Sequence, residues 1–201
     1  MNTAARLHTQ QQRLFGSSAL VLQWRGPQAW AYTATVWEGV QSAWQWPAPA
    51  IAVNGVDGYQ LWFGLQTPVS SEHAHAWSEA VFARWTPEAP THQRARLEAT
   101  PCPPMQDART GQWAAFVTPG LAPVFAETPW LDDAPNAEGQ ADVLSGLQTV
   151  PADAWAAALQ TASAAPLAPA TSTDPRAFLL AVMNDASVEM GLRIQAAKAL
   201  L

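Results

Sequence analysis

Alternating apolar and polar positions predict several short strands in the first part of the chain. The clearest is residues 59–65 (YQLWFGL), where successive side chains point to opposite faces, so that Gln60 and Trp62 lie together. Runs rich in apolar, β-branched and aromatic residues predict further strands at residues 19–24, 30–37, 51–53 and 113–118, with a short one at Leu97. If the core lies on the other face of residues 59–65, Gln60 and Trp62 are displayed on an open sheet face.

Apolar residues at helical spacing predict helices between and after these strands. Residues 71–85 follow a capping serine, Ser70 or Ser71, and carry an apolar stripe along one face. That stripe consists of Ala74, Trp77, Val81 and Trp85. Further helices are expected at residues 1–15, 38–46, 140–147 and 152–159.

This order of elements predicts an α/β (α+β) domain over residues 1–161, with a mixed or antiparallel sheet and helices packed on one face. Residues 162–173 are small residues and proline, a composition typical of a linker. Residues 174–201 then begin with Asp174-Pro175, a helix start signal, and are expected to form a helix pair. The apolar face that we expect to dock a partner consists of Phe178, Leu179, Val182 and Met183.

Composition and charge narrow the possible partners. The net charge of −6 arises entirely after residue 100, because the six arginines and six acidic residues of the first 100 positions cancel. Phosphate binding needs clustered Lys and Arg, so sequence-independent nucleic-acid binding is not expected, and nucleic acid is the weaker candidate partner. No apolar run approaches the ~18 residues of a membrane span, and the N-terminus has no apolar signal core, which predicts a cytoplasmic protein without membrane contact. A protein partner or self-association is expected instead.

Polar residues in the sequence do not form a recognisable catalytic or metal-binding pattern. His73 and His75 stand two positions apart on a predicted helix, so their side chains point in different directions, unlike the i, i+4 pair that binds zinc. His92 lies further along the chain. A second group of acidic residues does not have the ligand spacing of a calcium-binding loop; it consists of Asp132, Asp133, Glu138 and Asp142. We therefore expect no catalytic residue, no metal and no cofactor.

The lone cysteine and the tryptophans have structural interpretations. Cys102 excludes an intrachain disulfide, fits a reducing compartment, and has no basic neighbour to activate it. Most of the 11 tryptophans are expected in the core or at interfaces, because each buries a large area. The alternative is that Trp44, Trp46 and Trp62 form a platform on which bases stack.

Two stretches resemble the palm-like module of archaeo-eukaryotic primase-polymerases. Residues 53–69 (VNGVDGYQLWFGLQTPV) give a Gly-rich turn, a strand and a Pro-Val that opens a helix. Residues 103–107 (PPMQD) and 113–119 (WAAFVTP) are similar to the family's Pro-Gln turn and the strand after it, which ends in proline. The resemblance covers about residues 19–160 and implies a palm fold whose possible ligand-facing surface is Asp57, Gln60 and Trp62.

The departures from this family imply lost catalysis. Its metal-binding carboxylate pair would lie on a strand near residues 30–37, which hold no Asp or Glu, and its motif histidine falls at Gln60. Two-metal nucleotidyl transfer needs such carboxylates. Separately, residues 178–185 and 192–200 resemble a helical segment of phage small-terminase-like proteins. Both resemblances point to a phage or mobile element.

The leading hypothesis is a non-catalytic scaffold or interaction module that acts in DNA replication or packaging through protein contacts. One alternative is a packaging adaptor that works by self-association of its tail. Another is an enzyme with an unrecognised site, which a cluster of Glu98, Asp107 and His92 would favour.

Overall fold

The six strands of the described residues form one antiparallel sheet in the order β4-β1-β3-β2-β6-β5. The computed structural model describes residues 3–164 and residue 197. The strands are β1 Ala19–Arg25, β2 Ala50–Val53, β3 Gly58–Gly64, β4 Arg94–Leu97, β5 Met105–Gln106 and β6 Trp113–Val117. The helices are α1 Thr3–Phe15, α2 Ala29–Trp44, α3 Ser71–Trp85, α4 Ala137–Ser145 and α5 Ala152–Ala164, with 3-10 helices η1 Thr91–Gln93 and η2 Ala122–Phe125.

The first four strands, with α2 and α3, have the βαββαβ topology of ferredoxin-like folds. The chain runs β1-α2-β2-β3-α3-β4, and the sheet order β4-β1-β3-β2 places the two strands joined directly, β2 and β3, side by side. Strands β6 and β5 extend the sheet beyond β2. The predicted α/β class is confirmed, and its sheet is antiparallel.

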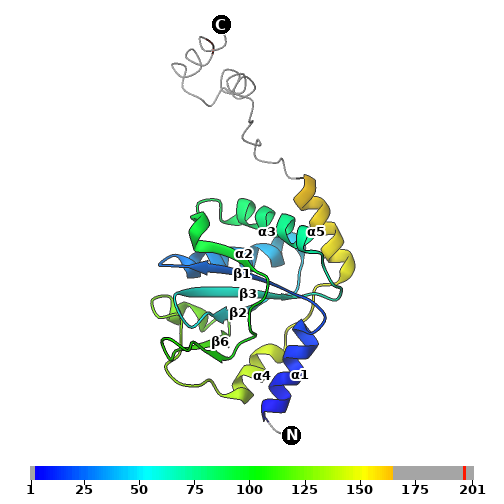
Figure 1. Ribbon diagram of the computed structural model, residues 1–201. Coiled ribbons are helices and arrows are strands. Elements are labelled where there is room, and N and C mark those ends of the chain that lie inside the picture. Colours follow the sequence, from blue (N-terminus) through cyan, green and yellow to red (C-terminus); the bar gives the residue numbers. More distant parts are fainter. Residues whose placement is uncertain (1–2, 165–196, 198–201) are drawn as a thin grey trace. The chain divides into compact units, whose positions relative to one another are not determined.

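One face of the sheet packs against α2, α3 and α5 through an aromatic cluster (Figure 1). The ring of Trp77, which is 0% exposed, stacks on Trp46 at 5.5 Å between centroids and meets Phe63 edge-on at 5.2 Å. Trp155 brings α5 into the same cluster at 5.6 Å from Trp77. Each large ring buries much apolar surface, so this cluster contributes strongly to stability.

The opposite face is covered by α1 and α4 (Figure 1). Phe15 of α1 stacks on Phe116 of β6 at 5.9 Å and lies 5.4 Å from Trp62 of β3. Arg13 joins the two helices, because its guanidinium donates to the carbonyls of Leu144 and Leu147 at the end of α4, each at 2.9 Å. The expectation that helices pack on one face only is therefore corrected, since helices cover both faces.

The predicted strand at residues 30–37 is wrong, because these residues belong to α2. Their aromatic and β-branched composition favours a strand, but the buried positions recur every three or four residues, as in a helix. These buried positions are Ala29, Tyr32, Thr33, Val36 and Val40. The helix predicted at residues 38–46 is the second half of α2, which ends where Gln45 adopts a left-handed φ of 55°.

Several other predicted elements are confirmed near their expected bounds. The strands at residues 19–24, 51–53, 59–65 and 113–118 correspond to β1, β2, β3 and β6. Helix α3 begins after Ser70, whose side chain accepts a hydrogen bond from the backbone N–H of His73.

At the C-terminal side, α5 continues through residues 162–164, which the sequence assigned to the linker. The rest of the linker and the helical appendage, apart from residue 197, lie outside the described residues. So does the predicted docking face of Phe178, Leu179, Val182 and Met183.

The buried hydroxyl of Thr33 gives a testable stability prediction. This side chain is 0% exposed, and its Oγ1 has no hydrogen-bond partner among the described residues. An unpaired buried hydroxyl is unfavourable, so Thr33→Val, which keeps the shape, should raise the free energy of unfolding by about 1 kcal/mol. Urea unfolding measures the change. The control is Thr35→Val on the same helix, because the exposed Thr35 hydroxyl already donates to the carbonyl of Ala31. A gain no larger than that of the control contradicts the prediction.

Candidate functional site

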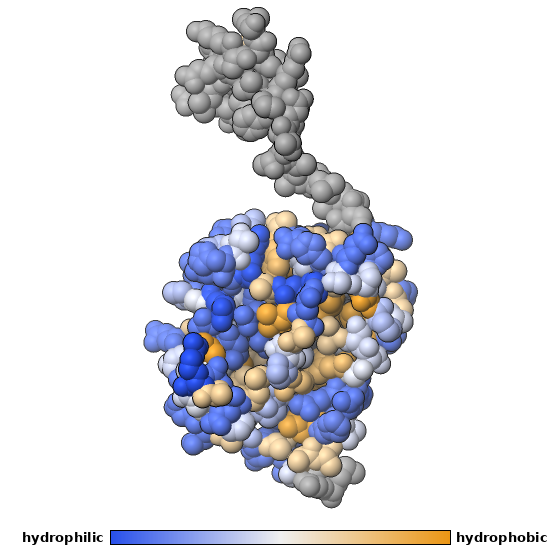
Figure 2. Space-filling view, viewed as in Figure 1, coloured by the Kyte–Doolittle hydropathy of each residue, from blue (hydrophilic) through white to orange (hydrophobic). Residues whose placement is uncertain are grey.

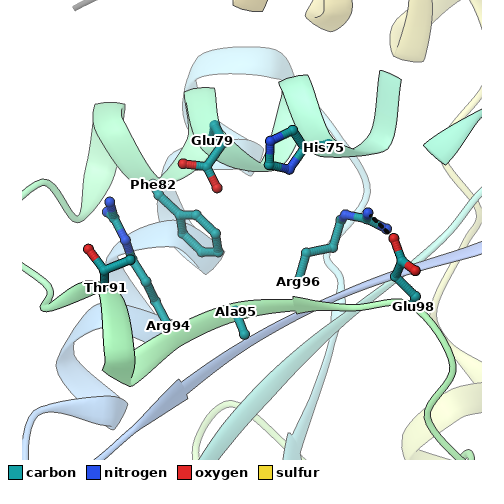
Figure 3. Close-up of a pocket in the computed structure, with 8 residues that line it drawn as sticks. All are labelled: His75, Glu79, Phe82, Thr91, Arg94, Ala95, Arg96 and Glu98. Carbon is teal, nitrogen blue, oxygen red and sulfur yellow. Dashed lines mark hydrogen bonds and ion pairs between the residues drawn. The ribbon is translucent and has the colours of Figure 1, made fainter. Parts of the chain in front are cut away.

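A cavity lies at the edge of the sheet, between α3 and β4 (Figure 3). Its volume is about 260 Å³. It is lined by His75, Glu79, Phe82, Thr91, Arg94, Ala95, Arg96 and Glu98. In Figure 3, the α3 side chains His75, Glu79 and Phe82 point toward β4, while Arg94 and Arg96 rise from β4 toward α3. Strand alternation places both arginines on the same face.

The side chain of Arg96 is only 13% exposed. Its Nη2 donates to Oε1 of Glu98 at 2.6 Å and to Oγ of Ser71 at 3.4 Å. Hydrogen bonds from Arg96 and then Ser71 lower the pKa of the Glu98 carboxyl, which keeps this residue ionised. The Nε of Arg96 is buried and has no acceptor within the described residues.

Arg94 is held in place at the other end of the cavity. Its Nη1 donates to the carbonyl of Thr86 at 3.1 Å, and its Cζ lies 5.0 Å from the centre of the Phe82 ring. Phe82 in turn meets Trp24 edge-on at 5.6 Å. The aromatic wall of the cavity is therefore continuous with the core.

The cavity is chemically suited to binding a small polar group. Glu98 lies beside Arg96 at the end of β4 and Glu79 lies across on α3, so the formal charges of the two arginines and two glutamates cancel. One donor, the Nε–H of Arg96, lacks an acceptor, and the exposed carboxylate of Glu79 forms no ion pair with a described residue. Glu79 therefore offers an accessible acceptor on the α3 side, whereas the Nε–H of Arg96 is enclosed by protein atoms.

The residues predicted as a ligand-facing surface take different positions. Gln60 and Trp62 do share a sheet face, but that face is not open, since their exposures are only 6% and 3% beneath the cover of α1 and α4. Nε2 of Gln60 donates to Oε1 of Gln23 at 3.0 Å, and Oε1 of Gln60 accepts from Nε1 of Trp62 at 2.9 Å. Asp57 is exposed and pairs with Arg25 at 3.0 Å. The expected open display of Gln60 and Trp62 is thus corrected.

The alternative platform of Trp44, Trp46 and Trp62 does not form. Trp44 and Trp46 belong to the cluster beside α3, with ring centroids 5.1 Å apart, whereas Trp62 packs on the opposite face with Phe15. The sheet lies between them.

The histidines and acidic residues considered for metal binding are dispersed. No group of three His, Cys, Asp or Glu side chains is placed to hold a metal ion within the part of the chain that the structure describes. Glu98 follows β4 and Asp107 follows β5, and these strands are at opposite edges of the sheet. The cluster of Glu98, Asp107 and His92 is therefore not assembled.

Sequence reasoning missed the two arginines of the cavity. The sequence predicts a strand only at Leu97, whereas β4 begins at Arg94. The alternation of Arg94 and Arg96 was the available signal, because it places two long cationic side chains on one face of a strand. The helix that faces them, α3, could not be predicted from this alternation, because its position depends on the order of the strands in the sheet.

Cys102 is predicted to react slowly in the folded protein. Burial raises the pKa of its thiol to about 12, with a hydrogen bond involving Gln11 acting in the opposite direction. The thiolate is the reactive form, so little of it exists at pH 8 until unfolding restores the ordinary pKa near 8.5. We expect an aromatic disulfide reagent to label the native thiol at pH 8 far more slowly than the urea-unfolded chain. Equal rates contradict this prediction.

No protein-family model and no curated protein matches the chain. None of the described helices is long and apolar enough to cross a membrane.

Proposed function

We propose that the chain is a non-catalytic interaction module on a primase-polymerase-like scaffold, which acts through protein contacts in the replication or packaging of phage or mobile-element DNA. The observation that carries the proposal is the covered second face of the sheet. Gln60, which stands where the resembled family has its histidine, has both side-chain polar atoms engaged by Gln23 and Trp62 beneath α1 and α4. Its role here is to hold the sheet together.

The packing around this position supports a structural role. Trp62 contacts both Phe15 and Phe116, with ring centroids at 5.4 and 5.9 Å, so aromatic rings fill the space beside Gln60. Catalysis on this face would need that space for a substrate. Here, a substrate would first have to displace α1, which is fixed to α4 by Arg13 and by the ion pair of Arg6 with Asp142 at 2.7 Å.

The outer surface supports contacts with other proteins. Figure 2 shows apolar atoms gathered in the middle of one face of the described domain, bordered by polar ones. Leu121 and Val124, near η2, are large apolar residues exposed by 49% and 71%. Contiguous exposed apolar surface is typical of interaction sites.

A strand-synthesis assay tests the proposal. The full chain is incubated with primed and unprimed DNA, Mg²⁺ or Mn²⁺, and all nucleoside triphosphates, beside an active polymerase under the same conditions. We expect no extended or newly made strand, and no saturable change in tryptophan fluorescence on addition of nucleotide with metal. Products above the no-enzyme level, made by the wild type and lost in Gln60→Leu, overturn the proposal.

A further inference from the structure

The described residues expose two large apolar side chains, and both belong to the same turn of η2. Leu121 stands directly before this short helix, and Val124 lies within it. The backbone N–H of Val124 donates to the carbonyl of Leu121 at 3.1 Å, which is the i to i+3 bond of a 3-10 helix. Side chains three positions apart in such a helix lie on the same side, so one partner surface can cover both.

This apolar pair is anchored to the core. Ala122, between the two exposed residues, is fully buried, and its carbonyl accepts a hydrogen bond from the hydroxyl of Tyr59 on β3 at 2.8 Å. The backbone N–H groups of Leu121 and Ala122 both donate to the carbonyl of Thr118, at 3.0 and 2.9 Å. The fold therefore holds Leu121 and Val124 outward on a fixed backbone, as a preformed contact surface requires.

The chain that follows η2 is acidic. From residue 110 to residue 164 it contains six acidic residues and no Lys, Arg or His. Four of the six lie between η2 and the first turn of α4, are exposed, and form no ion pair with a described residue; they are Glu127, Asp132, Asp133 and Glu138. Carboxylates without a cationic partner in their own chain attract cationic groups of another molecule.

The acidic stretch lies along β2, close to η2. η2 contacts β2, and the backbone N–H of Gly55, two residues beyond β2, donates to the carbonyl of Pro129 at 3.1 Å. β2 has four residues and is therefore about 13 Å long. This length is close to the Debye length of about 10 Å at 0.1 M salt. A partner segment that covers Leu121 and Val124 is therefore within the electrostatic reach of the carboxylates on either side of Pro129.

We infer that the η2 surface, which consists of Leu121, Val124, Glu127, Asp132 and Asp133, binds a cationic segment of a partner protein. The segment places apolar side chains over the apolar pair and Lys or Arg beside the carboxylates. A second copy of this chain fits the surface less well, because two copies that each carry a net charge of −6 repel one another. This inference rests on the proposed function, because it names the surface and the chemistry through which the module contacts its partner.

The probe is a displayed library of random dodecapeptides, selected on the full chain at about 50 mM salt. We expect the selected peptides to carry Lys or Arg around large apolar residues. The best of them, titrated into isotope-labelled protein, should shift the backbone amide resonances of residues 120–133. Raising the salt to about 500 mM should weaken binding about tenfold, because the surface charges are then screened.

Variants of the chain separate the apolar contact from the charged one. Leu121→Ser together with Val124→Ser, both at exposed positions, should weaken binding by about tenfold or more at either salt concentration, because apolar burial is not screened. Asp132→Asn together with Asp133→Asn should weaken binding at low salt only. Glu88→Gln is the matched control, because it removes an exposed, unpaired carboxylate between α3 and η1 and should leave binding unchanged.

Several results overturn the inference. These are no enrichment of any sequence, enrichment of acidic or uncharged peptides, resonance shifts outside residues 120–133, or full binding by the double serine variant. Self-association of the wild type in sedimentation, lost in Val124→Ser, would assign the surface to a second copy and also overturn the inference. Peptides bound elsewhere, with strand synthesis still absent, would overturn this inference and leave the proposed function standing.

Discussion

Replacing Trp77 with alanine is expected to lower the free energy of unfolding by about 3–5 kcal/mol, the cost of emptying a packed aromatic site. Trp77 is fully buried and contacts Trp46, Phe63 and Trp155 within 5.6 Å between ring centroids. These residues come from the α2–β2 loop, β3 and α5, so one truncation loosens three parts of the core. Urea unfolding followed by circular dichroism measures the loss.

Trp77→Phe is the matched control for this prediction. It keeps an apolar ring and removes an indole N–H that has no hydrogen-bond partner within the described residues. We expect its cost to be well below that of the alanine variant, because less volume is lost and an unpaired buried donor disappears. Equal costs for the two variants would contradict the packing described here.

The second large effect is expected at Gln140, which seals the edge of β6. Its side-chain amide pairs with one peptide unit of the strand, because Oε1 accepts from the N–H of Phe116 at 2.8 Å and Nε2 donates to the carbonyl of Phe116 at 2.9 Å. Gln140→Leu keeps most of the volume but leaves both backbone groups buried and unpaired. We expect the free energy of unfolding to fall by about 2–4 kcal/mol in urea unfolding.

Asp142→Ala, two residues further along α4, provides the control for Gln140. Asp142 forms an ion pair with Arg6, and its side chain is 61% exposed. Such a pair contributes about 0–1 kcal/mol, so the variant should lose little stability. If Gln140→Leu costs no more than Asp142→Ala, the side chain of Gln140 does not seal β6.

The order of apolar and polar residues within one segment was sufficient to predict those strands and helices that depend on that segment alone. Tyr59, Leu61, Phe63 and Leu65 form one apolar face of residues 59–65, and α3 carries both a serine cap and an apolar stripe. The pattern failed at residues 30–37, where the preference of aromatic and β-branched residues for strands opposed the helical spacing of the buried positions. Packing of that face on β1 and β3 decided the outcome in favour of the helix.

The covering of the sheet required information that no single segment carries. Leu7, Leu14 and Phe15 make α1 amphipathic, but they do not tell which of the two sheet faces the helix covers. For the same reason, Gln60 and Trp62 could be placed together from alternation but not assigned as buried. The cavity lies between α3 and β4, which are connected by a loop. Its position depends on the order of the strands in the sheet, which no single segment of the sequence specifies.

The central claim is that the second face of the sheet is interior, and native-state cysteine labelling tests it most directly. In a Cys102→Ser background, Ala52→Cys places a thiol on that face, where Ala52 is fully buried, and Ser17→Cys places one at an exposed position. We predict labelling of the buried position to be at least about 100-fold slower, at a rate that follows the unfolding equilibrium. Labelling of both positions at similar rates in the folded protein would show that α1 and α4 leave the face open, and would contradict the account.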